Sequence, residues 1–163
     1  MEQNKELVNY QDKYGKTPLI VYSEKGLLKC IEVLFNYSVN ITFIDSYGDT
    51  FLHKICKKGN TELLKKLGKY VFNNNENIID VKNNEELTPI MICAKNGNED
   101  MFYILKGHNA NLKLYDSHDN SVFHYICYNK ICIGLIVDNK PNKYGLTPKD
   151  YCRLSLDYYY FNG

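Results

Sequence analysis

One short segment recurs five times along this 163-residue chain and fixes the register of the residues between its copies. Each copy begins with Asp or Asn and reaches a Thr or Ser five positions later, and apolar residues follow in all but the last copy. These hydroxyl residues, the anchors of the register, are Thr17, Thr50, Thr88, Ser121 and Thr147. Successive anchors lie 33, 38, 33 and 26 positions apart. A period near 33 residues predicts a row of similar units packed on one another rather than one irregular globule.

The residues around each anchor are those of a tight turn followed by the start of a helix. Asp or Asn followed three positions later by Gly favours such a turn. The anchor hydroxyl can cap the next helix, and a Pro directly after it stands where a missing N–H costs nothing. The helix is then expected to end at Gly26, Gly59 or Gly97, because Gly readily adopts the left-handed conformation found at helix C-termini. In the fourth copy Asp119 replaces the turn glycine, which leaves the geometry of that turn open.

A second helix is expected after each of these glycines, because apolar residues recur there at helical spacing. They are Leu27, Cys30, Ile31, Leu34 and Phe35 in the first unit, Leu63, Leu64 and Leu67 in the second, and Met101, Phe102, Ile104 and Leu105 in the third. A single helix pair of this size cannot bury its apolar face, whereas stacked pairs can. The sequence therefore predicts an all-α solenoid of helix-turn-helix units whose terminal pairs act as caps.

A 33-residue period with Thr-Pro-Leu or Thr-Phe-Leu-His after a turn resembles the ankyrin-repeat family. The resemblance covers nearly the whole chain. It implies one ankyrin-repeat domain over residues 1–163, with about four helix-turn-helix repeats at residues 12–44, 45–82, 83–115 and 116–141 and a C-terminal part-repeat at 142–163.

Two repeats depart from the 33-residue length, and both ends are incomplete. We expect the five extra residues of the second repeat to fall at 70–77, where 72–77 should form a lengthened loop, because loops absorb insertions at little cost. The fourth repeat is seven residues short, so its second helix, at 130–138, should be short as well. Residues 6–11 are expected to form a strand-like run into the first hairpin. The aromatic tail at 156–161 either covers the open end of the stack or contacts a partner.

Two His-x-x-Cys motifs have the residue types of a zinc site: His53 with Cys56, and His124 with Cys127. They belong to the second and fourth repeats, and since packed helices lie about 8–10 Å apart, the motifs should be about 20 Å from each other. One metal ion cannot reach both. The resemblance places the histidines at a structural hydrogen-bonding position of the family and the cysteines at its small apolar positions, so no metal or cofactor is expected. The same packing role is expected for Cys30, Cys93, Cys132 and Cys152.

Composition and the motifs that are missing narrow the function classes. The formal net charge of +1 gives no general attraction to nucleic acid, which leaves nucleic-acid binding as a minor alternative. The N-terminal residues are polar and no apolar run could span a membrane, so we expect a cytoplasmic or nuclear location, in a host cell if the source is a virus or an intracellular pathogen. Phosphate-loop, dinucleotide-binding, zinc-protease and nucleophile-elbow motifs are missing, which predicts a non-enzymatic protein. A thiol-dependent enzyme remains an alternative.

The resemblance implies that a partner binds to the tips of the hairpins and to the inner face of each repeat's first helix. The register then predicts ten exposed binding residues: Tyr14, Tyr47 and Tyr144 at the tips, Lys54, Ile92 and Tyr125 four positions after an anchor, and Lys57, Lys58, Lys95 and Tyr128 seven or eight positions after one. Exposed Tyr is common at binding hot spots, and clustered Lys favours an acidic partner.

These observations predict a monomeric interaction module that acts as an adaptor, a targeting subunit or an inhibitor. The predicted partner is another protein, through an acidic and partly apolar segment, and no small-molecule substrate or membrane is expected. The alternative is a structural or regulatory fragment of a larger ankyrin-repeat protein.

Overall fold

A computed structural model describes residues 7–72, 78–131 and 138–161, with side chains described as far as residue 154. Its named helices are α2 (Pro18–Lys25), α3 (Leu28–Leu34), α4 (Phe51–Lys58), α5 (Thr61–Val71), α6 (Pro89–Lys95), α7 (Glu99–Gly107), α8 (Val122–Tyr128) and α9 (Pro148–Phe161). Within these ranges the only β contact is an isolated antiparallel bridge between Tyr115 and Ser121. The predicted all-α class is therefore confirmed.

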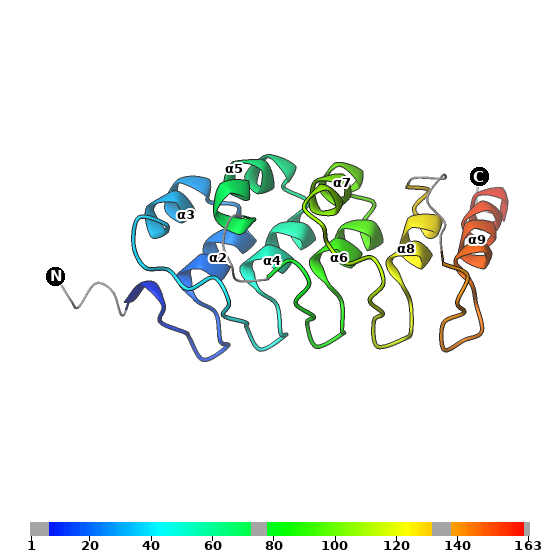
Figure 1. Ribbon diagram of the computed structural model, residues 1–163, viewed down its shortest axis with the longest axis horizontal. Coiled ribbons are helices and arrows are strands. Elements are labelled where there is room, and N and C mark those ends of the chain that lie inside the picture. Colours follow the sequence, from blue (N-terminus) through cyan, green and yellow to red (C-terminus); the bar gives the residue numbers. More distant parts are fainter. Residues whose placement is uncertain (1–6, 73–77, 132–137, 162–163) are drawn as a thin grey trace.

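The helices form two rows, with the hairpins projecting together from one side (Figure 1). The inner row runs α2, α4, α6, α8, α9, and each of these helices packs on the next. The outer row contains α3, α5 and α7, each packed on the inner helix of its own repeat. Apolar side chains such as Phe51, Leu64 and Phe102 are fully buried in the core of the stack. This arrangement confirms the predicted solenoid, and it leaves the hairpin tips as a continuous edge.

The anchors and the glycines delimit the inner helices as predicted. The Thr50 hydroxyl accepts a hydrogen bond from the His53 amide at 3.4 Å and caps α4. The left-handed φ angles of Gly26 (73°) and Gly59 (69°) end α2 and α4. In the third repeat α6 ends at Lys95, and the left-handed residue, Gly97, follows two positions later.

Two hairpins adopt the same left-handed turn without glycine. Glu86 has a φ of 57° and Asp119 a φ of 60°, compared with 72° for both Gly15 and Gly48. The sequence left the turn of the fourth hairpin open, and the structure gives it the same left-handed conformation as the turns with glycine. Because a side chain crowds the backbone in this conformation, these two turns form at a local cost in free energy.

The insertion that the sequence placed at residues 70–77 begins within a helix. Tyr70 and Val71 belong to α5, which has 11 residues compared with seven in α3. The ring of Tyr70 stacks on Phe35 at a centroid distance of 4.1 Å, and Val71 is buried, so packing against the neighbouring repeat extends the helix. The rest of the predicted loop, 73–77, lies outside the described residues.

The N-terminal end differs from the strand-like run that the sequence suggested. Residues 7–9 form a helical turn, and the Asn9 side chain ties it to the first repeat through the Ser38 carbonyl (2.9 Å) and the Asn40 amide (2.8 Å). The aromatic tail continues α9 as far as Phe161, with its side chains outside the described residues. Most of the predicted second helix of the fourth repeat, 132–137, also lies outside them. Within the described ranges, no helix has the length and apolar composition of a membrane span.

Candidate partner-binding site

Each hairpin is built around the side chain of the Asp or Asn that begins it. In the second hairpin, Asp45 Oδ1 accepts hydrogen bonds from the backbone amides of Tyr47 (2.9 Å) and Asp49 (3.0 Å). The corresponding oxygens of Asp12, Asn83, Asp116 and Asn142 accept the same two bonds in their own hairpins. A short side chain with an acceptor oxygen is needed at this position, which explains why only Asp and Asn occur there.

Neighbouring hairpins are joined by backbone hydrogen bonds at their tips. Each tip residue accepts a bond from an amide of the next hairpin: Tyr14 from Ser46 (2.8 Å), Tyr47 from Asn84 (3.0 Å), Glu85 from Ser117 (3.2 Å) and His118 from Lys143 (3.0 Å). The five tips therefore form one ordered row instead of five independent loops. A row held in this way loses little conformational entropy when a partner binds.

Aromatic side chains project from most of this row. Tyr14 is 53% exposed, and Tyr47 and Tyr144 are each 64% exposed. His118 is also exposed and stacks on Tyr144 at a centroid distance of 6.1 Å. Glu85 occupies the tip between Tyr47 and His118. Three predicted binding residues thus lie on one accessible edge.

Lys54 is not on that accessible surface, and the prediction that it is exposed is wrong. Its side chain is 7% exposed and its ammonium lies 2.6 Å from Asp45 Oδ2 and 2.7 Å from Asp49 Oδ2. Lys57 also reaches Asp49, at 2.6 Å, while 39% of its side chain stays exposed. The two buried carboxylates draw these lysines inward because a buried charge without a partner is costly.

The electrostatics of this cluster follow from burial and pairing together. Burial by itself would raise the pKa of Asp49, but hydrogen bonds from Lys54, Lys57 and Asn83 outweigh it and hold that pKa below its ordinary value. Burial would lower the pKa of Lys54, but its bonds to Asp45 and Asp49 raise it. Asp49 and Lys54 are therefore charged at neutral pH, and the cluster that they form is ionic.

Pairing leaves less free positive charge than the sequence suggested. The charges of Lys54 and Lys57 are balanced by Asp45 and Asp49, and Lys95 lies 3.5 Å from Glu85. Lys58 is exposed. A Lys57→Glu substitution would consequently place a further carboxylate beside Asp49 and disturb the fold as well as the surface.

Ile92 and Tyr125, predicted as exposed at the same register position as Lys54, also turn inward. Ile92 is 2% exposed, and Tyr125 is half-buried with its hydroxyl donating to Asp116 Oδ2. Burial and this hydrogen bond raise the pKa of Tyr125. Burial alone would raise the pKa of Asp116, but hydrogen bonds from Tyr125 and Asn120 lower it. For Tyr125 the sequence did hold a signal for the inward direction, namely the polar residues Asp116 and Asn120 at the base of its hairpin.

Amide groups connect the bases of successive hairpins. Asn83 Nδ2 donates to Asp49 Oδ1 at 2.9 Å, and Asn142 Nδ2 donates to Asn120 Oδ1 at 2.8 Å. Both bonds are buried and both run from the first residue of one hairpin to the residue before the preceding anchor. The inner face next to these bonds carries Tyr128, which is 51% exposed and lies edge-on to Tyr151 at 6.5 Å.

His53 and His124 hold successive repeats together. His53 Nδ1 accepts from the Thr50 amide (3.1 Å), so its Nε2–H donates to the Leu87 carbonyl of the next repeat (3.1 Å). His124 makes the equivalent bonds with Ser121 and Leu146. Burial lowers the pKa of both imidazoles. Each histidine thus has the predicted structural role, and the described residues contain no group of three or more His, Cys, Asp or Glu that could hold a metal ion.

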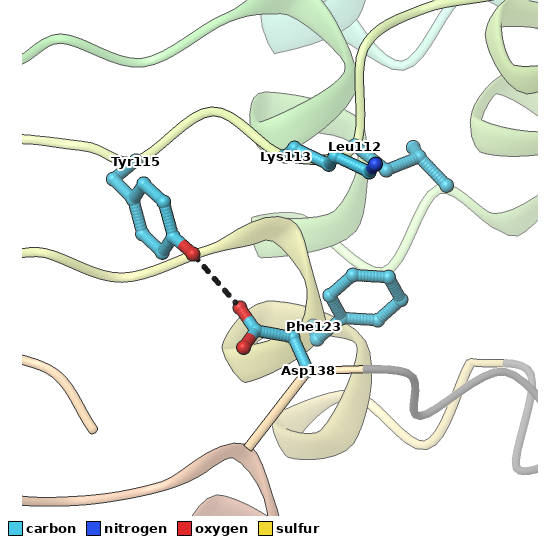
Figure 2. Close-up of a pocket in the computed structure, with 5 residues that line it drawn as sticks. All are labelled: Leu112, Lys113, Tyr115, Phe123 and Asp138. Carbon is cyan, nitrogen blue, oxygen red and sulfur yellow. Dashed lines mark hydrogen bonds between the residues drawn. The ribbon is translucent and has the colours of Figure 1, made fainter. Parts of the chain in front are cut away.

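A cavity of about 380 Å³ lies beside α8 (Figure 2). It is lined by Leu112, Lys113, Tyr115, Phe123 and Asp138, and the Tyr115 hydroxyl donates to Asp138 at 3.3 Å. Burial and Asp138 raise the pKa of Tyr115, so that hydroxyl stays protonated. The described lining residues include no cysteine.

The stacked helix pairs and the ordered row of exposed tips define a helical-repeat protein. A family model described as ankyrin repeats (3 copies) matches residues 2–77, and the chain belongs to the ankyrin-repeat family, as the sequence predicted. Two curated relatives are both named ankyrin repeat protein OPG189, one from Variola virus (isolate Human/India/Ind3/1967) and one from Variola virus. Each is 32% identical to this chain over 133 residues. The aligned part is 74% of this chain and 23% of each relative, so the chain spans less than a quarter of their length. Ankyrin repeats generally mediate protein–protein interactions, and the family is generally non-enzymatic.

Proposed function

We propose that this chain is a non-enzymatic interaction module that binds a partner protein with its hairpin tips and the adjoining inner face. The observation that supports this proposal most directly is the row of exposed aromatic tips. Tyr14, Tyr47 and Tyr144 are each more than half exposed, although the backbone that carries them is tied to the neighbouring hairpins. Rigid, exposed tyrosines are typical of binding hot spots, because they bury a large area with little loss of side-chain entropy.

The partner that fits this surface is a protein segment with apolar and acidic side chains. Apolar groups suit the tyrosine rings. Acidic groups suit Lys13 and Lys143, whose ammonium groups lie 5.0 Å and 5.2 Å from the ring centroids of Tyr14 and Tyr144. We therefore place the attraction for an acidic partner at the tips and at Lys58, instead of at the paired lysines Lys54 and Lys57.

The biological role that follows is that of an adaptor, a targeting subunit or an inhibitor that covers a partner's surface. A second proposal is that the chain acts as a structural or regulatory part of a larger ankyrin-repeat protein. It is motivated by the greater length of the two relatives, of which the aligned region is 23%.

The test compares two double variants as baits for affinity capture from the native cell or host. Tyr47→Ser with Tyr144→Ser removes two tip rings, whereas Tyr10→Ser with Tyr37→Ser removes two rings of similar exposure, 65% and 51%, away from the tips. Loss of two hot-spot side chains should lower recovery of the partner by at least about tenfold. The Tyr10/Tyr37 variant should recover it like the wild type. Equal recovery by both variants would place the binding site elsewhere.

A further inference from the structure

The inner row of helices contains two pairs of cysteines in the same register. Cys56 in α4 and Cys93 in α6 stand on helices that pack on each other and their side chains interact, as do Cys127 in α8 and Cys152 in α9. In both pairs the first cysteine stands six positions after the anchor of its repeat and the second stands five positions after the next anchor. The two pairs are therefore equivalent contacts, one within the stack and one at its C-terminal end.

The two pairs differ in how far solvent can reach them. Cys56 and Cys93 are both 0% exposed, and Cys127 is 3% exposed. Cys152 is half-buried. Burial raises the pKa of Cys56 and raises that of Cys127 to about 12, so neither is the thiol that an oxidant attacks first. An oxidant in solution can therefore reach Cys152, while both members of the inner pair are protected.

The pair Cys127 and Cys152 lies where the last helix packs on the rest of the stack. In the described residues α9 is the final member of the inner row (Figure 1). It packs on α8 through Tyr151, whose ring lies edge-on to His124 at 5.3 Å and to Tyr128 at 6.5 Å. A covalent bond next to these contacts would hold α9 in place.

We propose that Cys127 and Cys152 are a redox modification site that forms a reversible disulfide when the protein meets a hydroperoxide, and that this bond fastens α9 to α8. The Cys152 thiolate attacks the peroxide, the O–O bond breaks, and a sulfenic acid and water form. Cys127 then loses its proton, its sulfur attacks that of Cys152, and the S–O bond breaks with release of a second water. The two thiols together lose two electrons, and hydrogen peroxide is reduced to water. A dithiol reductant reverses the change.

The test exposes the full chain to hydrogen peroxide, blocks the remaining thiols with iodoacetamide and digests it with trypsin without reduction. Cleavage after Lys and Arg separates Cys127 (peptide 114–130), Cys152 (150–153) and Cys132 (131–143). Mass spectrometry should find 114–130 linked to 150–153. The inner pair provides the matched control, because its peptides, 55–57 and 83–95, should be linked at least about tenfold more slowly.

Thermal unfolding supplies a second readout. Closing a chain loop with a disulfide should raise Tm by roughly 5–10 °C in the oxidised wild type. Cys152→Ser should abolish this rise, whereas Cys30→Ser, at another half-buried cysteine, should retain it. The proposal is overturned if Cys127 and Cys152 are recovered as alkylated thiols, if either is linked to Cys132 instead, or if the inner pair is oxidised equally fast.

Discussion

The second and fourth repeats bury acidic groups at the base of a hairpin by different means. In the second repeat, Asp45 and Asp49 face the ammonium of Lys54, so charge is met by opposite charge. In the fourth repeat Asp116 is met by the neutral hydroxyl of Tyr125. Both partners stand four positions after the anchor. One register position thus serves either an ionic or a neutral hydrogen-bonded cluster, depending on the charge that the hairpin carries.

The third repeat shows what happens when the acidic groups are removed. Its hairpin has Asn83 and Leu87 at the positions of Asp45 and Asp49, and the residue four positions after the anchor is the apolar, buried Ile92. The three repeats together indicate that this inward position complements the hairpin of its own repeat. The residues four positions after an anchor are therefore poor candidates for partner binding.

The largest effect is expected from removing the cation of the ionic cluster. Lys54→Met keeps most of the side-chain volume but removes the cation paired with Asp45 and leaves Asp49 with Lys57. Breaking a buried ion pair on one side typically costs about 3–5 kcal/mol, so the free energy of unfolding should fall by that amount at neutral pH. Urea denaturation of the variant and the wild type measures the difference. A loss below about 1 kcal/mol, the value typical of surface pairs, would show that the cluster is solvated.

Acid should reduce the difference between this variant and the wild type. In the wild type the pKa of Asp49 is lowered, so its contribution to stability is present above about pH 4 and is lost as pH falls through the folded pKa. Without Lys54 that contribution is smaller, and the two unfolding curves should converge at low pH. Burial also lowers the pKa of His53 and His124, so both proteins should begin to lose stability below about pH 6.5.

A smaller loss is expected from the neutral cluster. Tyr125→Phe removes the hydroxyl that donates to Asp116 and leaves the carboxylate with the Asn120 side chain at 3.0 Å. A hydrogen bond to a charged group is worth roughly 1.5–3 kcal/mol, and the loss should lie in that range. Calorimetric unfolding would detect it. A loss as large as that of Lys54→Met would contradict the distinction between the ionic and the neutral cluster.

The smallest effects concern the hairpin turns of the same two repeats. Asp119→Gly in the fourth hairpin should gain roughly 0.5–1 kcal/mol, because glycine adopts the left-handed conformation without strain. Gly48→Ala in the second should be destabilising by more than that, since its Cβ would lie 2.5 Å from Asn84 Oδ1 and 2.8 Å from Asn84 N. Thermal shifts of opposite sign should therefore appear. If both variants are destabilised, the Asp119 side chain has a role of its own.

The sequence predicted the parts of the fold that depend on local chemistry. Each anchor directly precedes an inner helix, and Gly26 and Gly59 end α2 and α4, so the register was correct. The burial of Lys54 was missed because a lysine in a short amphipathic helix is ordinarily solvated. Its two acidic neighbours, Asp45 and Asp49, reverse that preference. The extension of α5 was missed because it depends on the stacking of Tyr70 against Phe35, a contact between repeats.

The buried hydrogen bonds that Asn side chains donate between hairpins limit how the repeats can be rearranged. Asn83 matches the oxygen of Asp49, and Asn142 matches that of Asn120, so each of these hairpins is complementary to the unit before it. An Asp in place of either Asn would offer no donor. We therefore expect that exchanging the order of the units would weaken the interfaces while leaving the individual helices intact, and that modular engineering of this chain should move adjacent units as pairs.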